Sequence, residues 1–454
     1  MDWHGMRSLV VGAGRSGLAA VKRLQALGAD VYLTDKKDEA ALPEIVGLKI
    51  PKDHLLLGRM IELAEVQPEL VVLSPGVPTN LPFIQEAMEK GIKVWGEVEL
   101  ALQNCPAFLV GVTGTNGKTT TTALSGELIR RTGRPTVVAG NIGIPLSGHV
   151  ENLPPEGVVV AELSSFQLEL CDRLRINVAI ILNITPDHLD RHKTLENYIE
   201  AKAQILKNQR PEDVAILNWD DPAVRNLASR TQGRVVYFSS TGFIPEGVSL
   251  QDGQIVWAEK GQVTPVIEPS KLHLRGAHNL ENVMAAIVAV RETGLSWEEI
   301  RQGLREFQGV SHRQEVVGRF DNILFINDSK GTNPDAAVKA LEAFDEPIVL
   351  IAGGKNKGLS FDGFMKVVKQ KVRSLILLGM AADLMEEAAR KAGVERIIRA
   401  NGFPEGVELA IREARAGDVV LLSPACTSWD MFNSYEERGE LFKELVRTHY
   451  KEPK

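Results

Sequence analysis

The sequence predicts an α/β protein of three domains, each built around a largely parallel sheet. Three observations lead to this class. Short apolar runs alternate with helical patterns along the chain, as strands and helices do in α/β folds. Two glycine-rich turns each follow an apolar run and precede a helical pattern. The 454 residues also exceed the roughly 250 to 300 at which a single hydrophobic core stops growing.

The first domain is expected over residues 1–104. It opens with a strand–helix–strand unit, and two later apolar runs are each followed by Gly or Pro, as buried parallel strands tend to be. The expected strands are residues 7–11, 31–34, 70–73 and 92–95, and a helix is expected over 18–27. This layout predicts a Rossmann-like domain.

The second domain is expected over residues 105–309. Its first strand leads into the second glycine-rich turn and a helix that runs to about Arg131. Between residues 235 and 274 the pattern changes to short alternating stretches broken by Gly and Pro, which predicts antiparallel strands. The other expected elements are strands at 108–112, 158–161 and 178–182 and a closing helix at 279–292.

The third domain is expected over residues 310–454, and it is a third α/β unit for which we also predict a Rossmann-like fold. Four strong apolar runs are separated by helical patterns. The expected strands are residues 323–326, 348–352, 375–378 and 419–422, and the helices include 336–344 and 383–392.

The composition excludes several classes of protein. A hydrophobic content of 44% with 24% charged residues is ordinary for a globular enzyme. The formal net charge of −7 gives no field that would attract nucleic acid or an anionic membrane. No apolar run is long enough for a signal peptide or a membrane span, and the three cysteines lack CxxC spacing. We therefore expect a cytoplasmic protein that binds neither nucleic acid nor membranes. Nothing in the sequence demands an oligomer, so we also expect a monomer.

The first glycine-rich turn is GAGRSG at residues 12–17, and Asp35 follows at the end of the second expected strand. Glycines at such positions let backbone amides approach a diphosphate, and the acid can accept a hydrogen bond from a ribose hydroxyl. NAD and UDP-sugars both contain these groups, so both ligands remain open. A role of the glycines in tight strand-to-helix packing alone is the structural alternative.

The second turn lies within GVTGTNGKTTTT, residues 111–122. Its pattern predicts ATP binding, with backbone amides and Lys118 on the phosphates and the Thr119 hydroxyl on Mg²⁺, in a P-loop ATPase-like central domain. The strict pattern places Gly where this chain has Val112, so the loop is a variant. The loop residues are Gly114, Thr115, Asn116, Gly117, Lys118 and Thr119.

Polar clusters follow several expected strands. Glu162 ends an apolar run, where a carboxylate facing a nucleotide would complete a Mg²⁺ site, although it could also be a surface acid. NITPDHLDRH contains His188 and His192, but no third soft ligand is near in sequence, which argues against zinc. That segment also supplies Asp187 and Asp190.

Three more clusters lie in the third domain: NDSKGTNP at 327–334, GGKNKG at 353–358 and SPACTSWDMF at 423–432. Each directly follows a predicted strand. Ligands in open α/β sheets bind outside the carboxyl ends of the strands. The three clusters therefore predict a ligand site in this domain.

With GNIG at 140–143, ELSSFQLE at 162–169, AHNLEN at 277–282 and the pair His312 and Arg313, these motifs resemble the Mur ligases. The resemblance covers essentially the whole chain. Within the family, GAGRSG, LTDKK, SPGVP and SPACTSWDMF are similar to members that add D-glutamate to UDP-N-acetylmuramoyl-L-alanine. The resemblance implies a cytoplasmic, ATP-dependent ligase of peptidoglycan precursor synthesis that uses two Mg²⁺ ions and whose three domains close over ATP.

The resemblance also implies roles for individual residues. The glycine turn would hold UDP rather than NAD. The UDP-substrate residues would be Gly14, Arg15, Ser16, Asp35, Lys36, Ser74, Gly76 and Asn141. The ATP residues would be the phosphate loop with Thr120, Asn279, Asn282, Arg313 and Asp328. The amino-acid residues would be Lys330, Thr332, Lys357, Ser428 and Tyr435.

The metal ligands implied by the resemblance are Thr119, Glu162, His188 and Lys202, the last carbamylated on its amine and so converted into an anion. Lys118, Glu162, His188 and Lys202 would be the catalytic group. Two departures affect the amino-acid pocket: Tyr435 stands where a family member has phenylalanine, and Lys355 stands where it has an acid.

The implied reaction begins when the alanyl carboxylate attacks the γ-phosphate of ATP and forms an acyl phosphate, which the amine of D-glutamate then attacks.

The motifs taken one at a time leave two other functions open. A NAD-dependent oxidoreductase is consistent with GAGRSG and Asp35 but leaves the phosphate loop without a role. A P-loop ATPase that acts as a mechanical or binding module is consistent with Lys118 but not with the first glycine turn.

Overall fold

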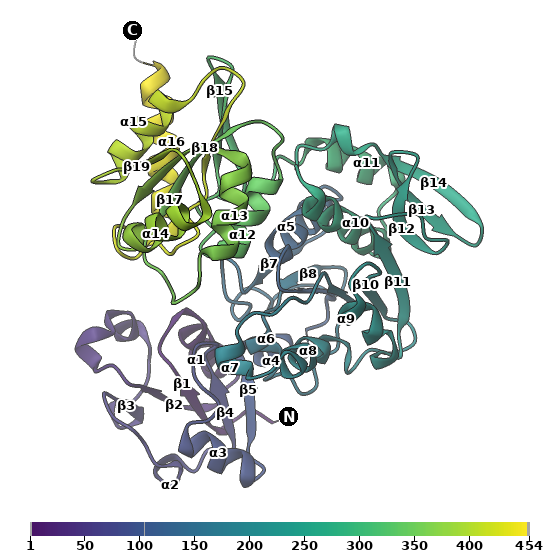
Figure 1. Ribbon diagram of the computed structural model, residues 1–454. Coiled ribbons are helices and arrows are strands. Elements are labelled where there is room, and N and C mark those ends of the chain that lie inside the picture. The colour runs from purple at the N-terminus through teal and green to yellow at the C-terminus, as the bar shows by residue number, and fades with distance from the viewer. Residues whose placement is uncertain (1, 104, 452–454) are drawn as a thin grey trace. The chain divides into compact units, whose positions relative to one another are not determined.

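The computed structural model describes residues 2–103 and 105–451, without the side chain of Asp190. The chain forms two compact units, Met1–Pro269 with Glu281–Leu304, and Ser270–Leu280 with Arg305–Lys454. Three largely parallel sheets with helices around them confirm the predicted α/β class (Figure 1). The predicted domain boundary at Asn104 lies outside the described residues.

The first sheet is fully parallel, in the order β3-β2-β1-β4-β5. Its strands are β1 Arg7–Val11, β2 Asp30–Asp35, β3 Leu55–Leu57, β4 Leu70–Leu73 and β5 Lys93–Gly96. This order is that of a Rossmann-like sheet, in which the strand order reverses between β1 and β4 and opens a ligand crevice there. Along β1, Leu9 and Val11 pack into one core and Val10 into the other, so both faces are covered.

The helices around this sheet are α1 Arg15–Ala26, α2 Leu63–Val66, α3 Pro82–Glu89 and α4 Glu97–Leu102. Three short 3-10 helices lie at Glu39–Ala41, Pro43–Gly47 and Lys52–His54. Helix α1 begins before Leu18, where we predicted its start, because Gly14 already caps it in extended backbone. The glycine turn is therefore itself the start of the helix.

The central sheet has nine strands in the order β14-β13-β12-β11-β10-β9-β6-β8-β7. The predicted antiparallel stretch over 235–274 is only partly right, because β11 pairs parallel with both β10 and β12 and the antiparallel pairs begin with β13. Alternating sequence shows which face of a strand is buried but not its pairing direction. The strands are β6 Phe108–Thr113, β7 Thr136–Gly140, β8 Val158–Glu162, β9 Val178–Ile181, β10 Val214–Asn218, β11 Arg234–Ser239, β12 Gly247–Gln251, β13 Gln254–Glu259 and β14 Gln262–Ile267.

Figure 1 shows α5 and α10 on one side of this sheet and α4, α6 and α8 on the other. Residues 283–290 of α10 are all buried, as expected for a helix that is enclosed by the protein. The helices are α5 Lys118–Arg130, α6 Ser165–Leu168, α7 Leu189–His192, α8 Leu195–Ala203, α9 Pro222–Arg225, α10 Ala277–Glu292 and α11 Trp297–Glu306, with 3-10 turns at Gln204–Leu206, Asn226–Arg230 and Pro269–Lys271.

Helix α4 joins the first sheet to the central sheet within one unit. Val98 and Leu102 pack into the central core, while Leu100 packs into the core of the first sheet. The buried carboxylate of Glu99 accepts hydrogen bonds from the backbone N–H groups of Asp172, Arg173 and Leu174. Such shared burial is why the contacts of the first two domains group together.

The third sheet has the order β15-β16-β20-β17-β18-β19, with only β15 antiparallel to its neighbour. Helices α12, α13 and α14 cover one face and α15 and α16 the other, which is a doubly wound, Rossmann-like arrangement. The strands are β15 Glu315–Phe320, β16 Ile323–Asn327, β17 Ile348–Gly353, β18 Val372–Leu378, β19 Ile397–Arg399 and β20 Val419–Leu422. The helices are α12 Pro334–Glu342, α13 Asp362–Lys371, α14 Ala382–Ala392, α15 Phe403–Glu413 and α16 Tyr435–Lys451.

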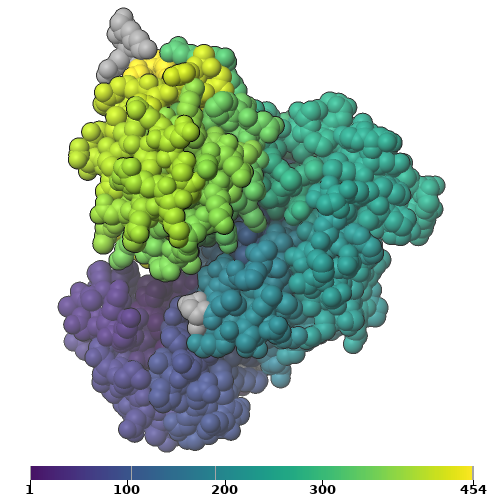
Figure 2. All heavy atoms as spheres, in the orientation of Figure 1, coloured from purple at the N-terminus to yellow at the C-terminus, as the bar shows by residue number. Residues whose placement is uncertain are grey.

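The green-to-yellow atoms of this third domain fill a closely packed body in the space-filling view (Figure 2). Among the described residues, no helix is both long and apolar enough to cross a membrane.

Candidate functional site

The glycine turn between β1 and α1 is shaped by close backbone packing. A Cβ at Gly17 would lie 1.8 Å from the Gly12 carbonyl oxygen, and Gly12 itself has φ +96. Gly14, by contrast, is exposed and a Cβ there would meet nothing within 4 Å. Backbone packing and conformation therefore require glycine at Gly12 and Gly17, whereas Gly14 faces open space where a ligand could lie.

The residues predicted to bind the UDP-substrate gather at the carboxyl ends of β1, β2 and β4. The Asp35 carboxylate accepts from the backbone N–H of Ala13 at 2.7 Å and of Lys37 at 2.9 Å. Ser74 Oγ donates to the Gly12 carbonyl at 2.9 Å. These two side chains shape the turn, while Gly14, Arg15, Lys36 and Gly76 are exposed and Ser16 is half-buried.

Asn141 lies elsewhere, in the loop after β7. Its side-chain amide donates to Glu162 Oε1 at 2.9 Å. The structure thus joins a residue predicted to bind substrate to one predicted to bind metal.

The phosphate loop runs from the end of β6 into α5. Val112, which replaces the expected glycine, is fully buried inside β6, so the loop proper begins later at Gly114. Gly117 has φ +86, and a Cβ there would lie 2.0 Å from Asn282 Oδ1. Two predicted ATP residues, Gly117 and Asn282, are therefore in close contact.

Lys118 and Lys202 bring two ammonium groups to one carbonyl. Lys118 Nζ donates to the carbonyls of Gly114 at 2.8 Å and Thr115 at 2.9 Å, and Lys202 Nζ donates to Gly114 at 2.8 Å. Lys202 is only 1% exposed. Burial, together with the charge of Lys118, holds the pKa of the Lys202 ammonium well below its usual range, against the opposing charges of Asp187 and Glu162.

Tyr198 is a part of this site that sequence reasoning missed. It is 1% exposed, its ring lies 4.5 Å from Lys202 Nζ, and its hydroxyl is 3.3 Å from Thr115 Oγ1. Burial raises the pKa of Tyr198 to about 12. The four-residue spacing of Tyr198 and Lys202, which puts both on one helix face, was the signal that could have revealed it.

The oxygen donors near the loop fit a hard divalent cation. Glu162 is 2% exposed, and its Oε2 is buried without a hydrogen-bond partner among the described residues. The Thr119 hydroxyl is also buried, at the start of α5. No three His, Cys, Asp or Glu side chains cluster as a metal cage in the described part of the chain, but Mg²⁺ beside phosphates needs only one or two carboxylates.

The two histidines after β9 occupy different environments. His188 is exposed, caps α7 with φ 53, and lies with its ring 4.9 Å from that of Phe166. His192 is buried, with Nδ1 2.9 Å from Glu169 and Nε2 2.9 Å from Ser165 Oγ. His188 is therefore the accessible one of the pair.

The remaining predicted ATP residues lie in the second unit. Asp328 is 5% exposed, and its carboxylate accepts from Ser423 Oγ at 2.7 Å and from the Gln314 N–H at 3.2 Å. Burial raises the pKa of Asp328 to about 6, although Ser423 and Arg313 oppose the shift. Asn279 Nδ2 donates to the Arg275 carbonyl at 2.7 Å, and Arg313 Nε is buried.

The predicted amino-acid residues surround the ends of β16, β17 and β20. Lys330 Nζ lies 5.5 Å from the centre of the Tyr435 ring. The loop after β16 is joined to that after β20 by the Ala425 N–H, which donates to the Gly331 carbonyl at 2.9 Å. Thr332 is half-buried, Ser428 is buried, and Lys355 and Lys357 are exposed on the β17 loop.

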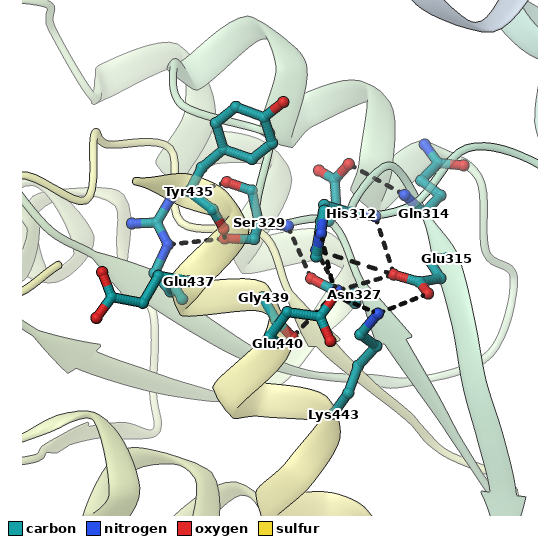
Figure 3. A network of polar contacts seen from close by, with 12 residues as sticks. His312, Gln314, Glu315, Asn327, Ser329, Tyr435, Glu437, Gly439, Glu440 and Lys443 are labelled. Atoms are coloured by element: carbon teal, nitrogen blue, oxygen red, sulfur yellow. Dashed lines mark hydrogen bonds and ion pairs between the residues drawn. The ribbon is translucent and has the colours of Figure 1, made fainter. Parts of the chain in front are cut away.

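A polar network supports this end of the sheet. Figure 3 shows Ser329 and Tyr435 at one end and Glu315 and Lys443 at the other, with Asn327 and His312 between them. Asn327 Nδ2 lies 3.0 Å from His312 Nδ1 and donates to Glu315 at 3.0 Å, and Lys443 contacts Glu315 at 3.1 Å. His312, Asn327 and Ser329 lie in motifs that the sequence analysis singled out, and Tyr435 was predicted to bind the amino acid. Glu315 and Lys443 were not predicted, because no motif contains them and they are 128 residues apart in the chain.

Family models match nearly all of this architecture. The model described as Mur ligase MurD-like, N-terminal domain, matches residues 6–96, the Mur ligase middle domain matches 112–290, and the Mur ligase glutamate ligase domain matches 312–426.

Curated relatives match over the full length. Two proteins of Desulfitobacterium hafniense, strains Y51 and DSM 10664 / DCB-2, are 64% and 66% identical over 453 residues, covering 100% of both chains. A protein of Clostridioides difficile (strain 630) is 45% identical over 98% of this chain and 99% of its own. All three are named UDP-N-acetylmuramoylalanine--D-glutamate ligase.

Solved structures share the fold. The UDP-N-acetylmuramate-alanine ligase MurC of Thermotoga maritima has a TM-score of 0.61 at 21% identity, covering 98% of this chain and 100% of its own. The MurF ligase of the same organism, solved with ADP, has a TM-score of 0.60 at 18% identity, covering 98% and 96%.

Proposed function

The chain belongs to the Mur ligase family, and we propose that it joins D-glutamate to UDP-N-acetylmuramoyl-L-alanine in an ATP-dependent reaction of peptidoglycan precursor synthesis. ADP and phosphate are released. The observation that carries the proposal is the identity of 64% and 66%, over the full length, with relatives named for this reaction. The phosphate loop and the polar strand-end clusters agree with it.

The chemical problem is that a carboxylate is a poor electrophile for an amine. In the proposed mechanism an oxygen of the alanyl carboxylate attacks the γ-phosphorus of ATP and ADP leaves. The amine of D-glutamate then attacks the carbonyl carbon of the acyl phosphate, loses a proton, and phosphate departs. The protein contributes mainly by positioning the reactants and by stabilising charge.

Lys118 supplies positive charge at the phosphates. Its ammonium already lies against the loop carbonyls of Gly114 and Thr115, so it needs little movement to reach a phosphate that the loop holds. Bound Mg²⁺ would neutralise charge on the phosphates. Thr119 and Glu162 Oε2, which has no hydrogen-bond partner among the described residues, would hold it, and in the two-ion arrangement His188 and the carbamylated form of Lys202 would do so as well.

Lys202 reacts, in this proposal, as a neutral amine. Its nitrogen attacks CO₂, forms an N–C bond and loses a proton, which leaves a carbamate anion. Burial and the neighbouring Lys118 both favour the neutral amine that this step requires. The product would place a negative charge beside Lys118.

The amino-acid pocket is proposed at the ends of β16, β17 and β20. D-glutamate carries two carboxylates, and Lys330 and Lys357 offer two cations for them, with hydrogen-bonding hydroxyls from Thr332 and Ser428. Tyr435 lies against Lys330. The first domain, proposed as residues 1–104, would hold UDP, the second, 105–309, ATP, and the third, 310–454, the amino acid.

The enzyme is further proposed to act as a cytoplasmic monomer on small molecules, without nucleic acid or membrane. The test is phosphate release in the presence of ATP and Mg²⁺. We expect release to require both UDP-N-acetylmuramoyl-L-alanine and D-glutamate, with L-glutamate, L-alanine and diaminopimelate failing as replacements. Release with ATP alone would indicate an ATPase, and preference for another amino acid would indicate a different ligase.

A further inference from the structure

Arg438 is a fully buried cation that lies outside all of the sequence motifs described above. It lies in the first turn of α16 and is 1% exposed. Burial lowers the pKa of the Arg438 guanidinium to about 10, against the opposing charge of Asp430, so the side chain stays protonated at neutral pH. A buried charge is costly unless it is hydrogen-bonded, so its partners indicate its role.

The guanidinium bonds to two different loops. Its Nε donates to Ser329 Oγ at 2.9 Å, and its Nη2 donates to the carbonyl oxygens of Ser329 at 2.8 Å and Cys426 at 3.3 Å. Ser329 Oγ in turn donates to the Tyr435 carbonyl at 2.8 Å. One planar group therefore joins the turn after β16, the loop after β20 and the start of α16.

These three segments carry the proposed amino-acid contacts. Ser329 directly precedes Lys330, Cys426 lies two residues before Ser428, and Tyr435 begins the helix that carries Arg438. In Figure 3, Ser329 lies beside Tyr435, and the ring of Tyr435 is the one that Lys330 contacts. Because Arg438 is buried, it does not reach the substrate and acts through these neighbours.

We propose that Arg438 is a positioning residue for the amino-acid substrate, which sets the spacing of Lys330, Ser428 and Tyr435 by holding Ser329 against the Cys426 carbonyl. The inference rests on the proposed function, which assigns those three residues to D-glutamate. Lysine keeps the charge but has no planar fork and cannot make the same set of bonds.

The test is the KM of each substrate in Arg438→Lys, measured by phosphate release. We expect the KM for D-glutamate to rise roughly tenfold or more, since small misplacements of substrate-holding groups have effects of this size. The KM for UDP-N-acetylmuramoyl-L-alanine should stay within about twofold of wild type. The proposed site of this substrate lies in the first domain and shares no contact residue with Arg438, and changes at such independent sites have little effect on each other.

Ser329→Ala provides a second variant that removes only a hydroxyl. It is expected to raise the KM for D-glutamate as well, and the double variant should be little worse than Arg438→Lys, because both changes remove the same hydrogen bond. Should Arg438→Lys fail to fold, Ser329→Ala alone decides the question, since an unchanged KM for D-glutamate in it contradicts the proposal.

Lys443→Gln is the matched control on the same helix. Lys443 is 8% exposed and bonds Glu315 and Glu440. Among the described residues it has no hydrogen bond to Ser329 or Cys426, and it reaches the loop after β16 only indirectly, through Glu315 and Asn327. We expect a lower unfolding midpoint but an unchanged KM for D-glutamate. Equal effects of the Lys443 and Arg438 changes on that KM would overturn the proposal, because they would indicate general loosening. If the wild type showed no turnover with D-glutamate, the proposed function itself would be wrong and the inference would fall with it.

Discussion

Lys202 and Arg438 are two equally buried cations in very different surroundings. Each is 1% exposed. Among the described residues, Lys202 donates to one acceptor, the Gly114 carbonyl, which it shares with the ammonium of Lys118, and Asp187 and Glu162 are its favourable charges. Arg438 donates to three acceptors and has Asp430 and Asp328 as favourable charges.

Burial therefore has opposite effects on the two side chains. A lysine beside a like charge and with few partners is poised to lose its proton, so burial makes it chemically reactive. An arginine keeps its proton and becomes a rigid connector when several of its donors are used, as Nε and Nη2 of Arg438 are, although its Nη1 is buried without a partner among the described residues. In the proposed function, burial at the phosphate loop prepares Lys202 for modification, and burial of Arg438 under the proposed amino-acid pocket fixes geometry.

The largest effect is expected from Lys118→Ala, which removes the neighbour that makes the site of Lys202 so cationic. We expect a loss of about 2–4 kcal/mol of transition-state stabilisation in kcat/KM, by analogy with other preorganised charge-stabilising groups. Steady-state phosphate release measures it. Normal turnover in this variant would show that Lys118 does not serve the phosphates.

Lys202→Ala tests whether Lys202 acts through a carbamate on its side chain. We expect activity to fall roughly a hundredfold, a typical effect of removing one electrostatic group from an active site. Activity should recover when a short carboxylate such as formate or acetate is added, because it can replace the carbamate. Arg438→Ala, as the control, should show no recovery, and a lack of recovery in Lys202→Ala would exclude a carbamate role.

A pair of methionine substitutions compares the two residues in stability. Arg438→Met leaves the carbonyls of Ser329 and Cys426 without this donor, so we expect a loss of about 1–3 kcal/mol in the free energy of unfolding. Lys202→Met leaves Gly114 still bonded to Lys118 and removes a buried like charge, so stability should change by less than about 1 kcal/mol or increase. Urea unfolding of both variants measures this, and the reverse order would contradict the comparison.

The smallest effect concerns pH. Burial raises the pKa of Asp328 to about 6, and the charge of Arg438 is one of the influences that oppose this rise. Below that pH the carboxyl is protonated and loses the negative charge of its proposed contact with ATP, so the KM for ATP should rise as the pH falls through 6, by less than about tenfold. In Arg438→Met the rise should begin at a higher pH. Asp328→Asn should show no such dependence, and a flat profile in the wild type would contradict the role of Asp328.

Much of the fold could be predicted from local patterns. The glycine turn, the phosphate loop and most buried strands follow from short apolar runs and from residues whose spacing matters locally. Strands β3, β7, β10, β15 and β19 were missed. The pairing direction of β11 was wrong, because pairing depends on which distant strand lies alongside. The role of α4 in joining two domains also depends on long-range burial.

The residues of the site that stand in local motifs were predicted, whereas those brought together by long-range packing were not. Lys118 and Glu162 stand at positions that local chemistry marks, next to a glycine loop and at the end of a strand. Tyr198 could have been found from its helical spacing to Lys202. The Arg438 contact with Ser329 spans 109 residues, and no local pattern indicates that two such residues meet. The assignments of individual side chains to UDP, metal and D-glutamate stay predictions until the variants are measured.

The proposed reaction depends most on activation of a carboxylate by phosphorylation. The direct measurement uses UDP-N-acetylmuramoyl-L-alanine labelled with ¹⁸O in its alanyl carboxylate, with ATP and D-glutamate, and analyses the released phosphate by mass spectrometry. If the carboxylate attacks the γ-phosphate, one labelled oxygen appears in each phosphate and the other stays in the new amide. Unlabelled phosphate alongside amide product would contradict an acyl phosphate and with it the central claim.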